Sequence, residues 1–200
     1  MNAIETLPAE DSRSRLLRAA MEVFAAEGYR VGVDRIAAQA GVAKQTLYNH
    51  FPSKGELFSA VIRLAVDELL VTLDDDARDL RARLTDFAVR YREKLLSPVG
   101  LGFFCTMVAE TRQFPELAQE FYRTGPAQAT ARLVALLRDA MQRGELRHAD
   151  PEFAANALLS MLVGAERNRY LFSGETPPVP DPAEARALVD IFLRGFAPAP

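Results

Sequence analysis

The stretch VDRIAAQAGVAKQTLYNHFPSKGE, residues 33–56, decides the fold. It holds two segments of helical character, 33–40 and 44–50, each too short to be stable alone. A three-residue turn that begins at Gly41 joins them, and glycine can adopt the positive φ that such a turn needs. The small side chain of Ala37 lets the two helices approach closely. The apolar positions between the helices are Ile36, Ala40 and Leu47. We predict a helix-turn-helix.

The second of these segments is too polar to be a core helix. Its hydrogen-bonding side chains are Lys44, Gln45, Thr46, Asn49 and His50. Leu47 and Phe51 have the spacing of inward-facing residues. A helix that presents Lys, Gln, Thr and Asn in its first turns can reach base edges in a DNA major groove. The segment is therefore a candidate recognition helix.

Helical periodicity continues through the rest of the chain, and we find no strand pattern. The predicted fold is all-α, with an amino-terminal three-helix helix-turn-helix domain and a carboxy-terminal helical bundle. Capping residues mark several helix starts, namely Asp11 or Ser12, Ser53 with Glu56, and Asp181 with Pro182. Gly28 can stop the first helix. The remaining helices are expected at 12–27, 54–73, 77–96, 101–113, 115–124, 126–143, 151–172 and 182–196.

The net charge of the 200 residues is −3, which by itself argues against a nucleic-acid partner. The charge is unevenly distributed along the chain. Residues 12–55 hold seven Lys and Arg against three Asp and Glu, whereas residues 56–200 carry a net −4. The predicted helix-turn-helix thus lies in a segment of net +4, and the charge pattern favours DNA contact there.

Other classes of function lack their sequence signals. The longest apolar run, Leu133–Leu137, is far shorter than a membrane span, and the amino terminus has no secretory pattern. We therefore expect a cytoplasmic protein that contacts no membrane. The sole cysteine, Cys105, is expected to be buried, because its neighbours are apolar. His50 and His148 are far apart in sequence, and no catalytic or nucleotide-binding motif occurs. We expect no enzyme activity, no catalytic residue, no metal and no cofactor.

The pattern IAxxAGVxxxTLYxHFxSKxxL, from Ile36 to Leu57, resembles the DNA-binding domain of TetR-type transcriptional regulators. Two later segments, FFCTMVAETRQFPELAQEFYRTGP and RGELRHADPEFAANALLSMLVG, are similar to the carboxy-terminal domain of the AefR-like branch. The resemblance implies a homodimeric repressor that binds a palindromic double-stranded DNA operator and is released by a small-molecule effector. We expect a flexible tail over residues 1–11, a helix-turn-helix domain over 12–58, and an effector-binding and dimerisation domain over 59–200.

Carried onto this sequence, the motif implies which side chains meet the DNA. The groove-facing residues would be Lys44, Gln45, Thr46 and Asn49, and the phosphate contacts would be Tyr48, His50 and Lys54. Tyr48 and His50 could also be a partly buried aromatic and a surface imidazole. The chain departs from the pattern at Gly32, where Thr or Ser commonly caps the second helix, and at Gly55, where Glu is usual. The exact backbone contacts therefore stay open.

The helix expected at 151–172 is unusually apolar. Between Phe153 and Val163 only Asn156 and Ser160 are polar, so this helix must be covered on several sides. We expect it to pair, together with the helix at 182–196, with the same helices of a second copy. The alternative is that it is the central helix of a monomer.

The middle helices contain aromatic and Met residues at helical spacing, which usually form plain core. In the family that the chain resembles, a cavity in this region holds the effector. The candidate effector residues are Phe87, Tyr91, Phe104, Met107, Glu110, Met161 and Glu166. Charged residues on these apolar helices, among them Glu110 and Glu166, are costly to bury unless they are paired or used by a ligand. Salt bridges are the favoured explanation for them.

One alternative function is kept. The chain could be a helical small-molecule binding or enzymatic domain whose head no longer reads DNA. The polar outer face of Lys44–His50 argues against this, because such a domain would not need it.

Overall fold

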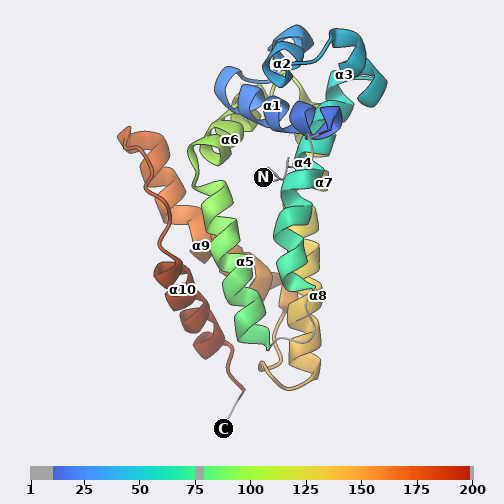
Figure 1. The fold of residues 1–200 in the computed structure, drawn as a ribbon. Coiled ribbons are helices and arrows are strands. Elements are labelled where there is room, and N and C mark those ends of the chain that lie inside the picture. The colour runs from blue at the N-terminus through green and yellow to red at the C-terminus, as the bar shows by residue number, and fades with distance from the viewer. Residues whose placement is uncertain (1–10, 75–78, 199–200) are drawn as a thin grey trace, which may run out of the picture.

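Helices joined by turns and loops make up residues 11–74 and 79–198, the parts that this computed structural model describes, and no strand occurs within these ranges. The predicted all-α class is confirmed. No helix within those two ranges has the length and apolar character needed to cross a bilayer. Figure 1 shows a small head of short helices at one end of a longer helical body.

The head consists of α1 (Ser12–Glu27), α2 (Val33–Ala40) and α3 (Lys44–His50), with the predicted bounds. α1 begins where expected because Asp11 Oδ1 accepts a hydrogen bond from the Ser14 N–H at 2.7 Å. It ends at Gly28, whose φ of 82° glycine adopts without strain. Residues 1–10 of the expected tail lie outside the described residues.

α4 (Lys54–Leu70) leaves the head and runs into the body (Figure 1). The predicted cap is confirmed, since Ser53 Oγ accepts from the Glu56 N–H at 3.1 Å. The α-helix stops three residues before the predicted end at 73, because Val71–Leu73 tightens into a 3-10 turn, η1.

The body holds six further helices among the described residues. Their bounds are α5 (Leu80–Leu95), α6 (Pro98–Glu110), α7 (Pro115–Thr124), α8 (Pro126–Gln142), α9 (Pro151–Ser173) and α10 (Pro182–Gly195). The predicted start of α6 at residue 101 was wrong, because the helix begins three residues earlier, at Pro98. Pro98 occupies the first helical position, and Ser97 Oγ accepts from the Gly100 N–H at 3.0 Å. The helix predicted from 77 begins at Leu80, and positions 77 and 78 lie outside the described residues.

Two apolar clusters hold these helices together. The body cluster is built mainly from α5, α8, α9 and α10. The head cluster is built from α1 to α4 and also takes in Phe103 and Met107 of α6. The hydroxyl of Thr106, between these two residues, donates to the Phe24 carbonyl of α1 at 3.1 Å. α6 therefore fastens the head to the body.

Cys105 is exposed, so the prediction that it is buried was wrong. Phe103 and Met107 lie one turn apart on the face of α6 that packs against the head. The residue midway between them must point the other way, whatever the character of its sequence neighbours.

A buried arginine joins three helices of the body. The side chain of Arg92 on α5 is only 1% exposed. Its guanidinium donates to the Leu162 carbonyl at 2.7 Å, to Glu166 Oε2 of α9 at 2.5 Å and to Glu184 Oε2 of α10 at 2.6 Å. Because a buried cation is tolerated only with such partners, this network fixes α9 and α10 against α5.

Candidate nucleic-acid interface

The turn between α2 and α3 has the predicted geometry. Gly41 adopts a left-handed conformation, with φ 64° and ψ 39°, and its N–H bonds back to the Ala37 and Ala38 carbonyls. The Val42 N–H also bonds to the Ala37 carbonyl, at 3.0 Å. Ala37 itself is buried between the helices. The turn therefore holds α3 at a fixed angle to α2.

α3 has a buried apolar side and an exposed, mostly polar side. Leu47 is fully buried, and Phe51 just beyond the helix is buried as well. The exposed residues of α3 are Lys44, Gln45, Tyr48, Asn49 and His50, whereas Thr46 is half-buried. The side chains of Gln45 and Asn49 lie one turn apart, and Gln45 Nε2 donates to Asn49 Oδ1 at 3.1 Å. Every candidate base-contacting residue is thus on or beside one accessible face.

Lys44 is held by an acidic neighbour in this structure. Its Nζ lies 3.0 Å from Asp34 Oδ2 of α2, and both side chains are largely exposed. The hydrogen bond to Asp34 raises the pKa of Lys44 above its ordinary value, so the ammonium stays charged. An exposed pair of this kind contributes little to stability, and Lys44 can exchange Asp34 for DNA at small cost.

Lys54, at the start of α4, lies between the head and the body. Its Nζ is 4.5 Å from the centre of the Tyr29 ring, a cation–π contact. Burial lowers the pKa of Lys54, and the negative charge of Glu110 on α6 opposes that shift. Lys54, the predicted phosphate-binding lysine, therefore already interacts with Tyr29 and Glu110 of the protein itself.

The joint between head and body contains residues to which the sequence assigned no role. Arg30, in the loop after α1, donates from Nε to Glu110 Oε1 of α6 at 3.1 Å and also bonds to Gln113. Its guanidinium lies 6.0 Å from the centre of the Phe114 ring. Tyr29 packs edge-on against Phe114, with ring centres 5.7 Å apart. These pairs are about 80 residues apart in sequence, and no local pattern links their members.

The candidate effector residues do not form one group. Phe87 and Tyr91 stack on α5 with ring centres 5.3 Å apart, and the ring of Phe104 lies 4.3 Å from the guanidinium of Arg167. Glu166 is bound to Arg92. Met161 is exposed on α9. Met107 and Glu110 lie elsewhere, because Met107 is buried in the head cluster and Glu110 pairs with Arg30. Salt bridges, the favoured explanation for Glu110 and Glu166, are confirmed.

Two family models match the chain. Residues 16–61 match the model described as bacterial regulatory proteins of the tetR family, and residues 82–198 match the C-terminal domain of AefR-like transcriptional repressors. The two matches coincide with the helix-turn-helix head and with most of the body.

Individual relatives agree with these matches. The HTH-type transcriptional repressor SCO4008 of Streptomyces coelicolor is 34% identical over 160 residues, which cover 77% of this chain and 76% of the relative. The HTH-type transcriptional activator FasR of Mycolicibacterium smegmatis is 45% identical over 89 residues, 40% of this chain and 41% of FasR. The solved structure of the flavonoid-responsive regulator FrrA superposes with a TM-score of 0.68 at 29% identity, covering 94% of this chain and 98% of FrrA. These relatives are named as regulators and not as enzymes.

Proposed function

The chain belongs to the TetR family of bacterial transcriptional regulators, and from this premise we propose that it is a dimeric repressor released from its operator by a small-molecule effector. Its site of action is then the cytoplasm, where the operator DNA lies. The domain division at residue 58 stays part of this proposal, with α4 continuing from one domain into the other.

The observation that carries the proposal is the two-sided character of α3. Leu47 anchors the helix in the head cluster, while the opposite face offers hydrogen-bonding side chains to solvent. We assign base contacts to Lys44, Gln45, Thr46 and Asn49 and phosphate contacts to Tyr48, His50 and Lys54. An amide such as Gln45 can recognise adenine in the major groove, and an ammonium such as Lys44 can recognise guanine.

Dimerisation is supported by the surface of α9 and α10. Figure 1 shows α10 flanking α5 on the side opposite α4. Large apolar side chains on these two helices are exposed, namely Phe153, Met161, Phe172 and Ile191. Small residues, including Ala157 and Gly164 of α9 and Ala187 of α10, lie among them and would allow close approach of a second copy. Two heads held by such an interface would read a palindrome with half-sites about 34 to 36 Å apart, or a multiple of that spacing.

The effector residues are proposed to act in two groups. Phe87, Tyr91, Phe104 and Glu166 would contact the effector within the body, with Met161 at its α9 boundary. Met107 and Glu110 would transmit the change, because both are on α6 and contact the head. An effector can release the operator only if it binds the released conformation more tightly than the DNA-bound one.

The family match of the body favours repression over activation. The model that matches residues 82–198 is described as a domain of repressors, and so is the relative with the longer aligned segment, SCO4008. FasR is named an activator, so activation is the alternative. Transcription in vitro from a promoter that contains the operator distinguishes them, since added protein should lower the transcript yield if the chain is a repressor.

Footprinting on the DNA that flanks the gene of this protein tests the proposal. We expect two protected half-sites related by a twofold axis, at a salt concentration low enough to retain phosphate contacts. Absence of any sequence-specific complex at low salt would contradict the proposal.

A further inference from the structure

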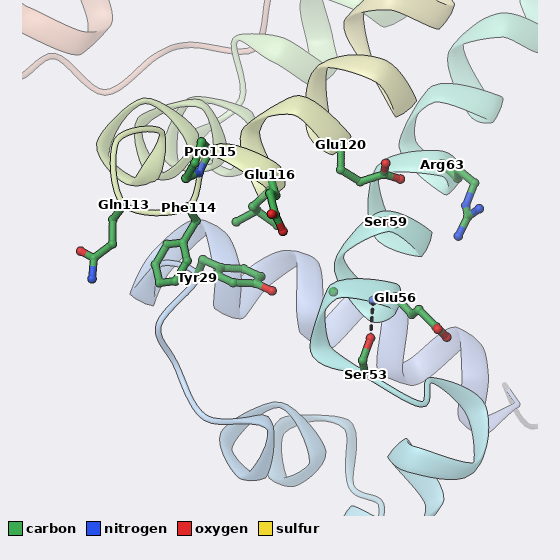
Figure 2. Close-up of a pocket in the computed structure, with 12 residues that line it drawn as sticks. Tyr29, Ser53, Glu56, Ser59, Arg63, Gln113, Phe114, Pro115, Glu116 and Glu120 are labelled. Atoms are coloured by element: carbon green, nitrogen blue, oxygen red, sulfur yellow. Dashed lines mark hydrogen bonds between the residues drawn. The ribbon is translucent and has the colours of Figure 1, made fainter.

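A cavity of about 680 Å³ lies at the joint between the head and the body. Figure 2 shows its lining. Its walls come from the loop after α1 (Tyr29), the first turns of α4 (Ser53, Glu56) and the start of α7 (Phe114, Glu116, Leu117). Small-molecule sites in proteins have volumes of roughly 300 to 1,000 Å³, so the cavity can hold a ligand. It is separate from the effector residues assigned above, none of which lines it.

Gly55 keeps this cavity open. A Cβ atom added at Gly55 would lie 3.8 Å from Ser53 Oγ and 4.0 Å from the Tyr29 hydroxyl oxygen, in ordinary contact with both. The backbone there is helical, so a side chain would be tolerated and would project beside the Tyr29 hydroxyl. Glycine in the first turn of a helix costs helix stability, and what it provides here is space.

The two ends of the cavity differ in character. One end is mainly apolar, with the rings of Tyr29 and Phe114 beside Pro115 and Leu117, and Gln113, which accepts a hydrogen bond from Arg30, lies at its edge. At the other end lie Glu120 and Arg63, and Glu116 lies between the two ends (Figure 2). The ring faces of this joint already accept cations, since Lys54 Nζ lies over Tyr29 and the Arg30 guanidinium over Phe114.

The charge of the lining is negative. The Glu120 carboxylate accepts hydrogen bonds from Arg123 Nη2 at 2.6 Å and from Thr124 Oγ1 at 2.9 Å. The carboxylates of Glu56 and Glu116 have no ion pair within residues 11–74 and 79–198, and neither has the exposed Arg63. Each of the two carboxylates is in the first turn of a helix, whose dipole favours the charged form of the carboxylate. The lining keeps a net negative charge, because Glu56 and Glu116 outnumber Arg63, the one cation among the described lining residues.

We propose that this cavity binds an organic cation that carries a compact apolar or aromatic group. The apolar group packs against Tyr29, Phe114 and Leu117, and the cationic group is held by Glu116 and Glu56. Because the lining comes from the head, from α4 and from α7, the ligand touches both sides of the joint at once. The site is additional to the effector site in the body and does not depend on it.

Isothermal titration of the full-length protein with benzyltrimethylammonium tests the proposal without DNA. Phenylacetate, of similar shape but opposite charge, is the matched probe. We expect the cation to bind and phenylacetate not to bind. The double variant Glu56→Gln/Glu116→Gln should weaken binding of the cation about tenfold. The variant Glu93→Gln, which removes an exposed carboxylate of α5 outside the cavity, should leave its affinity unchanged.

A variant that fills the cavity with a larger side chain distinguishes loss of the binding site from unfolding of the protein. Gly55→Leu should abolish binding of the cation while raising the melting temperature, because leucine is the better helix former. Binding that survives Gly55→Leu, equal binding of phenylacetate, or no heat from the cation at millimolar concentration would overturn the proposal. Operator binding by the same unliganded proteins is measured separately, so a failure of the proposed regulatory function is distinguishable from a failure of this site.

Discussion

Arg30 of the head and Glu110 at the end of α6 form an ion pair across the joint, with Nε and Oε1 3.1 Å apart. The Glu110 side chain is only 13% exposed, whereas Arg30 is 60% exposed. The negative charge of Glu110 also acts on Lys54, a proposed phosphate contact, and opposes the lowering of the pKa of that lysine by burial. The last turn of α6 therefore interacts with two cations, Arg30 of the head and Lys54 at the start of α4, and a shift of α6 would change the environment of both.

The variants Arg30→Met and Glu110→Gln, alone and together, measure this pair. Because one partner is exposed, we expect a coupling free energy of roughly 0.5 to 1 kcal/mol from urea unfolding. The coupling should shrink when salt is raised from 50 mM to 500 mM, since screening weakens exposed pairs. Strictly additive single-variant effects would show that the pair contributes nothing.

Replacement of Arg92 should destabilise the body far more. Arg92→Met removes the guanidinium that binds Glu166, Glu184 and the Leu162 carbonyl. We expect a loss of about 2 to 3 kcal/mol in the free energy of unfolding, less than for a fully buried pair because both carboxylates are partly exposed. Arg90→Met on the exposed face of α5 is the control, and its loss should stay within about 0.5 kcal/mol.

Charges on the exposed apolar surface of α9 and α10 should prevent dimerisation. Phe153→Glu with Ile191→Glu places carboxylates where a second copy would bury them. Sedimentation at micromolar concentration should then give a monomer, whereas the unaltered protein gives a dimer. Val108→Glu, an equally exposed apolar position on α6, should remain dimeric. A monomeric unaltered protein would refute the proposed assembly.

The stability of the protein should fall at alkaline pH partly through Tyr91. Burial raises the pKa of Tyr91 in the folded state above the ordinary value of 10.0. Below pH 10 both states keep the proton, and this residue causes no pH dependence. Between pH 10 and the raised pKa only the unfolded state ionises, so unfolding becomes easier as pH rises, by up to about 1.4 kcal/mol per unit. Tyr91→Phe should flatten that part of the curve, and Tyr122→Phe, at an exposed position, should not.

The parts of the fold that sequence predicts well are those with local causes. The head helices begin and end at the predicted residues and α4 begins at the predicted one, because Asp11, Gly41 and Ser53 act through their own backbone neighbours. The start of α6 was misplaced because Pro98 can either break a helix or open one, and only the Ser97 cap decides between them.

The joint could not be predicted in the same way. Tyr29 meets Phe114, and Arg30 meets Glu110, only after α6 has folded back onto the head. The same holds for the cavity, whose lining comes from three separate segments. Even within a single helix, burial cannot be predicted from adjacent residues alone. Cys105 is exposed although its sequence neighbours are apolar, because neighbours in sequence do not share a helical face.

The most direct test of α3 as the recognition helix compares affinities for the operator and for a scrambled duplex of equal length, measured by fluorescence anisotropy over a range of salt. Lys44→Ala and Gln45→Ala should each lower operator affinity by about 1 to 3 kcal/mol while leaving the scrambled duplex almost unchanged. Lys54→Ala should weaken both duplexes equally and reduce the salt slope by about one. Equal losses on both duplexes for all three variants would contradict the assignment of α3 as the element that reads sequence.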